Sequence, residues 1–460
     1  MHIVAIGGSD AGISAALRAR ELDPSVDVTV VVADSYPNYS ICGIPYYFSG
    51  DVQPWQSLAH RTHADLEATG MTLRLDTLAT RIDAGARRLN VQDASGESSL
   101  SYDELIVGTG ALPAFAGIRG LDSLGPDDGV HVIHSIGDTF ALERHLDERD
   151  PKTALIIGAG YVGLEMAEGF TGRGIHVTQL QRGTEVLSTL DPELAGAVHT
   201  ELVRHGVEVH TGTTVHAVEK TDAGVTVHAE RGGAPITFTV DLVLAVVGVR
   251  PNTTLLEQAG ATLGAGGAVM VDEHMRTGIP NVFAAGDGVI THHRLLGTTY
   301  LPLGTTAHKQ GRVAGENAIG GSARFAGSVG TQVVKVFDVV AARTGLREHE
   351  AAAAGYLPST TQSVADDHKR YYPGAQPISI RITGDTESGL LLGAQLVGRL
   401  GTETAKRVDT YATALFAGLT VAQVSDLDLS YTPPLGSPWD AVQAATQAWS
   451  RAHTAAAVPA

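Results

Sequence analysis

The spacing of apolar and polar residues predicts a strand, a turn and a helix at the start of the chain. The apolar run at residues 2–6 ends in the glycine-rich turn Gly7–Gly12, and residues 13–23 have apolar side chains at helical spacing. Backbone amides at the start of such a helix can bind a pyrophosphate. A second apolar run, at residues 26–33, ends before Asp34, 22 residues after Gly12, where a dinucleotide fold needs a carboxylate for a ribose. The sequence therefore predicts a dinucleotide site, with a serine at its middle glycine position, formed by Gly7, Ser9, Asp10, Ala11, Gly12 and Asp34.

A second unit of the same kind lies at residues 153–170, where the glycine pattern is intact. The strand after it, residues 175–182, ends in Gln181 and Arg182, so the acid that would hold an unmodified ribose is missing and a cation is near. This favours NADPH over NADH. The alternative is that Arg182 is a solvated surface charge. The predicted cofactor residues of this unit are Gly158, Gly160, Tyr161, Val162, Gly163, Gln181 and Arg182.

Composition narrows the class of protein. The chain has 460 residues, 54 glycines and 43% hydrophobic residues, which is typical of a large α/β protein of about three domains. Its net charge of −18 argues against nucleic acid or an anionic membrane as partner. No apolar run is long enough to cross a bilayer and no basic leader precedes residue 2, so we expect a cytoplasmic protein. The 19 histidines show no metal-ligand spacing, and we predict no metal.

Three further segments resemble a known family. Residues 277–293, with Gly286 and Asp287, resemble the second flavin-binding motif of the pyridine nucleotide-disulfide oxidoreductases, in which the carboxylate holds the ribitol chain. Residues 102–113 resemble the family's crossing segment, with Gly108 where alanine is usual, and residues 247–252 precede the flavin motif. The resemblance adds to the cofactor residues Thr109, Gly110, Gly248, Gly286 and Asp287.

The surroundings of the only cysteine, Cys42, indicate a branch of this family. Residues 41–51 resemble the coenzyme A-disulfide reductase branch of the single-cysteine group, which also includes NADH oxidase and NADH peroxidase. Residues 301–321, 371–375 and 426–440 agree with that branch. The resemblance implies FAD and NAD(P)H as cofactors, a small-molecule disulfide such as coenzyme A disulfide as substrate, and a homodimer.

The predicted fold class is α/β, with two Rossmann-like dinucleotide-binding domains and an α+β C-terminal dimerisation domain. The FAD-binding domain is predicted to be split between residues 1–113 and 252–325, with the NAD(P)H-binding domain at 114–251 between them. From residue 326 to 460 the pattern changes to alternating strands, at 331–337, 378–382 and 390–398, followed by a helix around 405–417.

We interpret Cys42 as the redox centre. Gly43 and Pro45 suit a turn that leads into a helix, and amide dipoles at a helix start favour a thiolate. The alternative is a small buried hydrophobic residue, the usual fate of a single cysteine. The resemblance implies that the thiolate attacks a disulfide to give a mixed disulfide, which the reduced flavin then cleaves. It also implies that the departing thiolates are met across the dimer by Tyr431 and by Tyr371 or Tyr372, which could otherwise be half-buried interface rings.

The resemblance assigns the remaining site residues. Glu165 is expected to face the nicotinamide, although it could equally be an exposed helix charge. A helix that starts near Leu303, Gly304 and Thr305 is expected to point at the pyrimidine edge of the flavin. The residues expected to hold the substrate are Arg18, Arg20, Ser40 and Arg61.

Three departures from the family put the substrate in question. Ile41 replaces a small or polar residue, and Glu21 stands where a basic residue is common. Asp10 takes the place of a histidine found in the oxidase and peroxidase relatives. An ionised acid close to the sulfur would oppose thiolate formation. Two other functions therefore stay open: an oxidase or peroxidase that cycles through a cysteine sulfenic acid, and a flavin-bearing redox sensor without turnover.

Overall fold

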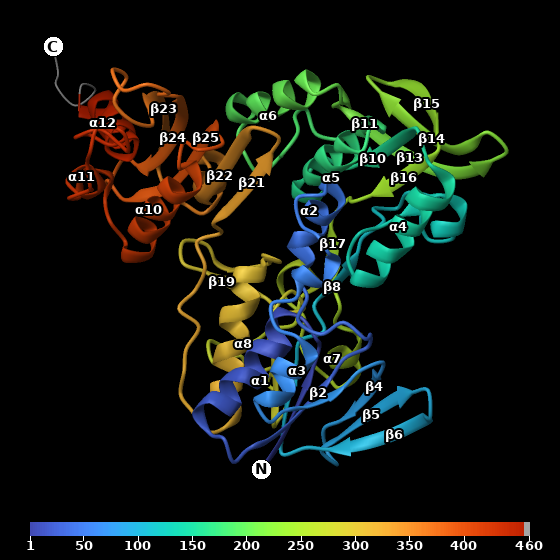
Figure 1. Cartoon of the computed structure of the whole chain (residues 1–460). Coiled ribbons are helices and arrows are strands. Elements are labelled where there is room, and N and C mark those ends of the chain that lie inside the picture. The colour runs from blue at the N-terminus through green and yellow to red at the C-terminus, as the bar shows by residue number, and fades with distance from the viewer. Residues whose placement is uncertain (455–460) are drawn as a thin grey trace. The chain divides into compact units, whose positions relative to one another are not determined.

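The computed structural model describes residues 1–454 and separates into two compact units. The first consists of residues 1–114, 134–140 and 248–328, and the second of residues 115–133, 141–247 and those from 329 onward (Figure 1). Within residues 1–454 no helix combines the length and the apolar character needed to cross a membrane.

The first unit is built on a five-stranded parallel sheet. Apart from the edge strand at residues 72–74, its strands are almost entirely buried and rich in valine and isoleucine, as expected for a sheet covered on both faces. All neighbours are parallel. The order across the sheet is β18 (Val282–Ala284), β7 (Glu104–Val107), β1 (His2–Ile6), β2 (Asp27–Val31) and β3 (Thr72–Arg74).

Two long helices of this unit, α1 (Asp10–Leu22) and α8 (Gly304–Ala318), lie side by side (Figure 1). Glycines make the close approach possible, because a Cβ on Gly311 would lie 2.3 Å from the carbonyl oxygen of Ala11 and one on Gly315 would lie 2.2 Å from that of Ala15. The unit also contains α2 (Ile44–Ser49), α3 (His63–Ala68), α7 (Thr254–Gln258), the meander β4 (Leu78–Asp83), β5 (Arg88–Asp93) and β6 (Gly96–Ser101), and the pairs β8 (Ala111–Pro113) with β17 (Val249–Pro251) and β19 (Thr291–His293) with β20 (Gly297–Thr299).

The second unit contains another five-stranded parallel sheet. Its order is β12 (Glu208–His210), β11 (His176–Leu180), β10 (Thr153–Ile157), β16 (Leu242–Ala245) and β9 (Val130–His131). The accompanying elements are α4 (Ile136–Arg149, which begins in the first unit), α5 (Tyr161–Gly172), α6 (Pro192–Arg204) and the antiparallel strands β13 (Thr213–Thr221), β14 (Gly224–Arg231) and β15 (Ala234–Val240).

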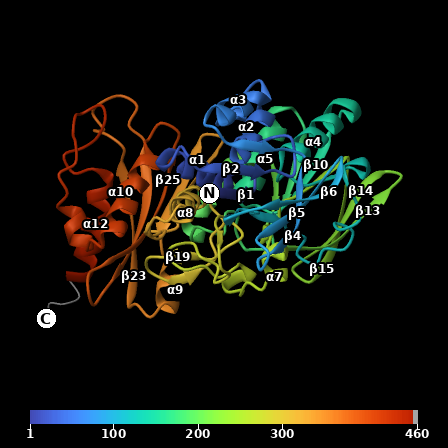
Figure 2. The same cartoon turned by 90° about the horizontal axis from the view of Figure 1, so that it is seen from below.

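The C-terminal part of the second unit is an antiparallel sheet with helices. The strands follow the order β21 (Gln332–Val336), β22 (Val339–Gly345), β25 (Leu391–Arg399), β24 (Pro377–Asp385) and β23 (Pro358–Asp366). Helix α10 (Thr404–Ala417) packs on β22 and β25, and α12 (Ala441–Thr454) packs on β23 and β24 (Figure 2). The short helices α9 (Glu348–Ala353) and α11 (Val421–Ser425) complete it. The strands and the helix predicted for this region are confirmed, as is the fold class; the domain boundaries stay a prediction.

Candidate functional site

The motifs predicted for the flavin meet at one edge of the first sheet. Parallel strands end at the same edge, so Gly7 after β1, Asp34 after β2, Thr109 after β7 and Asp287 after β18 all follow carboxyl ends that lie together. The chain order reverses between β1 and β7, and ligands of open α/β sheets bind at such a switch point.

The first glycine loop is shaped so that only glycine fits. Gly7 has φ +111°, and a Cβ there would lie 2.2 Å from the carbonyl oxygen of Gly108. A Cβ on Gly12 would lie 2.2 Å from the carbonyl oxygen of Gly7. Ser9 is the N-cap of α1 but its side chain makes no capping hydrogen bond, so the first amides of the helix are left for an anionic group.

The loop that carries Asp287 is fixed from α8. The side chain of Gln310 accepts a hydrogen bond from the amide of Gly286 (2.9 Å) and donates one to the carbonyl of Ile290 (3.2 Å). Burial, and next to it the charge of Asp10, raises the pKa of Asp287 to about 6. A largely buried carboxyl that accepts hydrogen bonds from ligand hydroxyls suits the predicted ribitol contact.

Two more features of this edge fit a dinucleotide. The backbone N–H of Asn38, a residue that is 2% exposed, donates to the carbonyl of Gly8 (2.6 Å). The side-chain Oδ1 of Asn38 has no hydrogen-bond partner within residues 1–454. A buried atom of this kind is matched by a polar ligand group. The hydroxyl of Thr109 donates to the carbonyl of Asn252 (2.7 Å), whose amide donates to Gly110 (2.9 Å), so the two crossing segments are joined. Gly248 lies at the start of the second of these segments, and Leu303 is the N-cap of α8.

Cys42 lies in a single 3₁₀ turn, Ile41–Gly43, directly before α2. Its side chain is exposed, so the alternative of a small buried hydrophobic residue is wrong. Ser40 donates its amide to the carbonyl of Leu58 (2.8 Å), which braces the turn. The predicted helix is present but has only six residues, so its dipole contributes less to a thiolate than that of a long helix.

In the second unit the glycine loop has the same construction. Gly158 has φ +110°, and a Cβ there would lie 2.4 Å from the carbonyl oxygen of Val246, while one on Gly163 would lie 2.2 Å from that of Gly158. Gly160, in contrast, has open space on the side where a Cβ would point. Helix α5 begins at Tyr161, whose hydroxyl donates to Oε1 of Gln332 (2.6 Å).

The remaining residues of α5 face different ways. Val162 is exposed, whereas Glu165 is half-buried and close enough to Tyr161 for its charge to contribute, behind burial, to the raised pKa of that tyrosine. A half-buried position argues against Glu165 being only an exposed helix charge.

The end of β11 has the composition expected for a phosphorylated ribose. Gln181 accepts a hydrogen bond from the amide of Ala159 (3.3 Å), so its side chain turns toward the glycine loop. Arg182 is exposed and makes no ion pair within the part of the chain that the structure describes. Sequence reasoning missed Arg231, which donates to Nδ1 of His210 (3.2 Å), one strand away from Gln181. Its distance along the chain left no local signal.

The predicted substrate residues differ in what they contact. Arg18 pairs with Glu316 (2.6 Å) and Glu21 (3.0 Å). Arg20 donates to three backbone carbonyls, those of Thr69, Pro24 and Val26, and therefore braces the fold rather than facing a ligand. Arg61 is exposed and has no ion pair within residues 1–454.

The predicted tyrosines lie in the second unit and are exposed: Tyr371 by 73%, Tyr372 by 45% and Tyr431 by 44%. The neighbouring Tyr371 side chain and partial desolvation raise the pKa of Tyr431. Lys369 donates its amide to the carbonyl of Pro433 (3.3 Å), so the two segments lie together. The structure thus brings together two of the three tyrosines.

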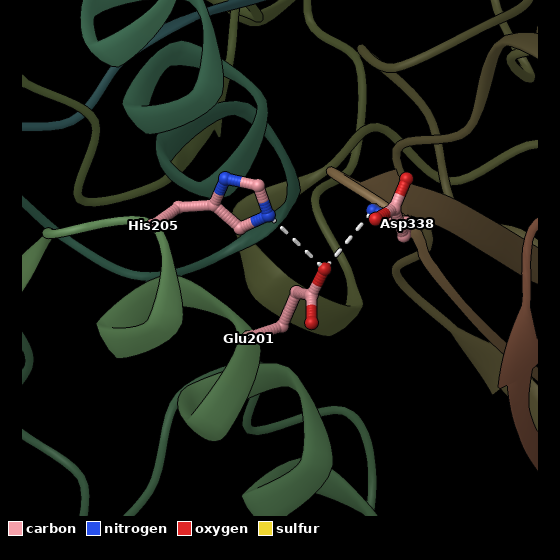
Figure 3. Close-up of side chains that lie close together, drawn as sticks. All are labelled: Glu201, His205 and Asp338. Carbon is pink, nitrogen blue, oxygen red and sulfur yellow. Dashed lines mark hydrogen bonds and ion pairs between the residues drawn. The ribbon is translucent and has the colours of Figure 1, made fainter.

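Within residues 1–454, one side-chain group has ligand atoms close enough for a metal: Glu201, His205 and Asp338 (Figure 3). Glu201 is nearly buried and accepts hydrogen bonds from Arg204 (2.6 Å) and Arg399 (3.0 Å). Although burial raises it, these contacts hold the pKa of Glu201 at about 2. Two guanidinium groups oppose a bound cation, so we interpret the group as an ion-pair cluster.

The fold and both dinucleotide edges define an oxidoreductase with two nucleotide sites. The sequence model of the pyridine nucleotide-disulphide oxidoreductase family matches residues 1–311. The sequence model of the family's dimerisation domain matches residues 331–441. The chain belongs to the pyridine nucleotide-disulphide oxidoreductase family. Membership implies FAD and NAD(P)H as cofactors, and the dimerisation domain indicates a homodimer.

Similar proteins cover almost the whole chain. An NAD(P)H sulfur oxidoreductase (CoA-dependent) of Pyrococcus abyssi is 34% identical over 95% of this chain and 96% of its own length. A coenzyme A disulfide reductase of Staphylococcus haemolyticus is 27% identical over 96% of this chain and 97% of its own. The solved structure of an NAD-dependent persulfide reductase from A. fulgidus, 34% identical, has a TM-score of 0.93 and covers 99% of this chain and 84% of that one.

Proposed function

We propose that this protein is an FAD-dependent NAD(P)H oxidoreductase that reduces a low-molecular-weight disulfide, persulfide or polysulfide through Cys42. The observation that carries the proposal is the position of the only cysteine: it is exposed, and it follows by four residues Asn38, whose amide is bound to the glycine loop at Gly8. The names of the similar sulfur, persulfide and coenzyme A-disulfide reductases support the same chemistry.

In the proposed reaction the thiolate of Cys42 attacks one sulfur of a disulfide RS–SR. A Cys42–SR mixed disulfide forms and one RS⁻ leaves. FAD, when bound, would supply the electron pair from NAD(P)H that cleaves this mixed disulfide, so that the second RS⁻ leaves and the thiolate of Cys42 is restored. Gly7, Gly12, Asp34 and Asp287 would hold the flavin. Tyr371 and Tyr431, whose side chains are neighbours, would donate protons to the departing thiolates across the dimer.

We also propose that NADPH is preferred over NADH. The support is a cation, Arg182, with no ion pair within residues 1–454, in a place where a carboxylate would select an unmodified ribose. Replacing Arg182 with Glu should lower kcat/KM for NADPH and raise that for NADH. If the ratio of kcat/KM for NADPH to that for NADH equals the wild-type value in steady-state assays, Arg182 does not determine the cofactor preference.

Coenzyme A disulfide and smaller acceptors can be separated through Arg61. The guanidinium of Arg18 pairs with two carboxylates, and that of Arg20 donates to backbone carbonyls. Of the arginines expected to hold the substrate, Arg61 therefore has a guanidinium still available for a nucleotide tail. An Arg61→Ala variant should raise KM for coenzyme A disulfide several-fold and leave KM for a small disulfide such as cystine unchanged. Equal KM values for coenzyme A disulfide in both proteins would favour small persulfides or polysulfides.

The function itself is tested by anaerobic addition of NADPH to the yellow holoenzyme. The flavin should bleach. A long-wavelength thiolate band should also appear in the wild type, and this band should be absent in Cys42→Ser. A panel of acceptors then compares disulfides and polysulfide with O2 and peroxide. An NADH oxidase of Methanocaldococcus jannaschii is 30% identical to this chain, so an oxidase with a Cys42 sulfenic acid is the second candidate. Faster turnover with O2 or peroxide than with every disulfide would establish that candidate instead.

A further inference from the structure

A small polar network joins the starts of α1 and α8, next to the predicted flavin site. Asp10 in the first turn of α1 lies 3.3 Å from Nε2 of His308 on α8, measured from its Oδ1. Nδ1 of His308 lies 2.8 Å from the hydroxyl of Ser14. Both nitrogens of the ring are therefore engaged, and the ring is held in one orientation.

Asp10 occupies a sensitive place. A Cβ on Gly304, the first residue of α8, would lie 2.8 Å from Oδ2 of Asp10, so this carboxylate is at the N-terminal end of a 15-residue helix. That helix end is the one expected to face the flavin. The charge of Asp10 also adds to the raised pKa of Asp287, which identifies the two carboxyls as neighbours. An unpaired Asp10 would therefore repel Asp287 and compete with a ligand for the dipole of α8.

Resting on the flavin site of the proposed function, we propose that His308 is a positioning residue of the redox centre: fixed by Ser14, its imidazole lies against Asp10 and keeps that carboxylate from acting on the flavin site.

The charged groups around the pair do not supply this compensation. Along the same faces of α1 and α8 the next cations, Arg18 and Arg312, are paired with Glu21, and Arg18 also with Glu316. The ring of His60 lies near His308, with ring centroids 6.3 Å apart. The other carboxyl group close to Asp10 is that of Asp287. Lys309 is exposed on α8. Within residues 1–454, no basic side chain other than His308 forms an ion-pair contact with Asp10.

The test is a double-mutant cycle on the holoenzyme. His308→Leu should lower the temperature at which FAD fluorescence signals flavin release by about 2–4 °C, and should slow alkylation of Cys42 by iodoacetamide. The double variant Asp10→Asn/His308→Leu should recover most of both losses, because the uncompensated charge has gone. A residue that only fills space would not be rescued by removing the charge of its neighbour.

A matched control is available on α3, where His63 lies 3.6 Å from Glu67 in an exposed pair far from the glycine loop in sequence. His63→Leu should leave both readouts at the wild-type value. The inference would be overturned if His308→Leu behaved like the wild type, or if the double variant were no better than His308→Leu. In either case the proposed function would still stand, provided that the wild-type protein binds FAD. A wild type that binds no FAD would instead overturn the proposed function.

Discussion

His131 and His145 lie edge to face in the second unit, with ring centroids 4.9 Å apart and an interplanar angle of 88°. Both are buried, at 2% and 7% exposure, and Nε2 of neither ring has a hydrogen-bond partner within residues 1–454. Burial, with a smaller contribution from His145, lowers the pKa of His131 from 6.5 to about 3. The fold therefore requires a neutral His131.

This pair predicts a loss of stability in mild acid. Because the folded state resists protonation that the unfolded chain accepts, stability is fully present above pH 6.5 and falls as the pH drops toward about 3. The slope from His131 is at most about 1.4 kcal/mol per pH unit. Urea unfolding at pH 7, 6 and 5 should show a smaller decrease for His131→Phe than for the wild type. Equal decreases would contradict the prediction. Charges of Arg149, Lys220 and Asp241 also act on the pKa of His145, behind burial.

Two glycines of the second nucleotide loop should respond differently to alanine. In Gly163→Ala the new Cβ would meet the carbonyl oxygen of Gly158 at 2.2 Å, so we expect a loss of stability of about 1–3 kcal/mol. Gly160→Ala meets no protein atom within 4 Å and has an ordinary φ of −83°, so its stability should equal that of the wild type.

The difference lies in cofactor binding. The space beside Gly160 is where a pyrophosphate would approach the backbone, so Gly160→Ala should raise KM for NADPH tenfold or more. Thermal unfolding and steady-state kinetics on the two variants check both halves. A Gly160→Ala variant with a wild-type KM would show that the cofactor does not use this loop.

The two sheet edges with glycine loops could be predicted from the sequence because their signals are local. A glycine loop lies between one strand and one helix, and the residues after strands such as Asp34 and Asp287 share an edge whenever the strands are parallel. The contacts of Arg20 could not be predicted in this way, since the carbonyl of Thr69 reaches it through the tertiary fold, 49 residues along the chain. The link between Ser14 and His308 spans 294 residues and depends on how closely α1 and α8 pack.

Gln310 predicts a connection between core packing and flavin retention. It is fully buried, and both ends of its amide are used by the loop around Gly286 and Ile290. Gln310→Leu leaves those two backbone groups without partners, which costs about 1–3 kcal/mol for each buried group. We expect a lower unfolding temperature and weaker FAD retention together. Gln56→Ala, on the exposed surface of the same unit, serves as the control and should change neither.

Arg407 and Asp440 predict how the segment with Tyr431 is held. The guanidinium of Arg407, on α10, is 8% exposed and pairs with Asp440 at 2.8 Å. It also donates to the carbonyls of Thr402 (2.5 Å) and Asp367 (2.6 Å). Residues 426–440 are thus fastened to α10 at their end, and removal of one partner leaves a buried charge uncompensated.

Arg407→Met should therefore destabilise the protein by about 3–5 kcal/mol, and Arg407→Met/Asp440→Leu by clearly less. Because Tyr431 lies in the fastened segment, the single variant should also lose disulfide reductase activity more steeply than Tyr431→Phe does. Arg370→Met provides the comparison: Arg370 is 86% exposed and pairs with Asp366 at the surface, where such pairs contribute about 0–1 kcal/mol. Urea unfolding of Arg407→Met, of the double variant and of Arg370→Met checks the ranking. A loss for Arg407→Met no larger than that for Arg370→Met would show that the buried pair does not anchor the segment.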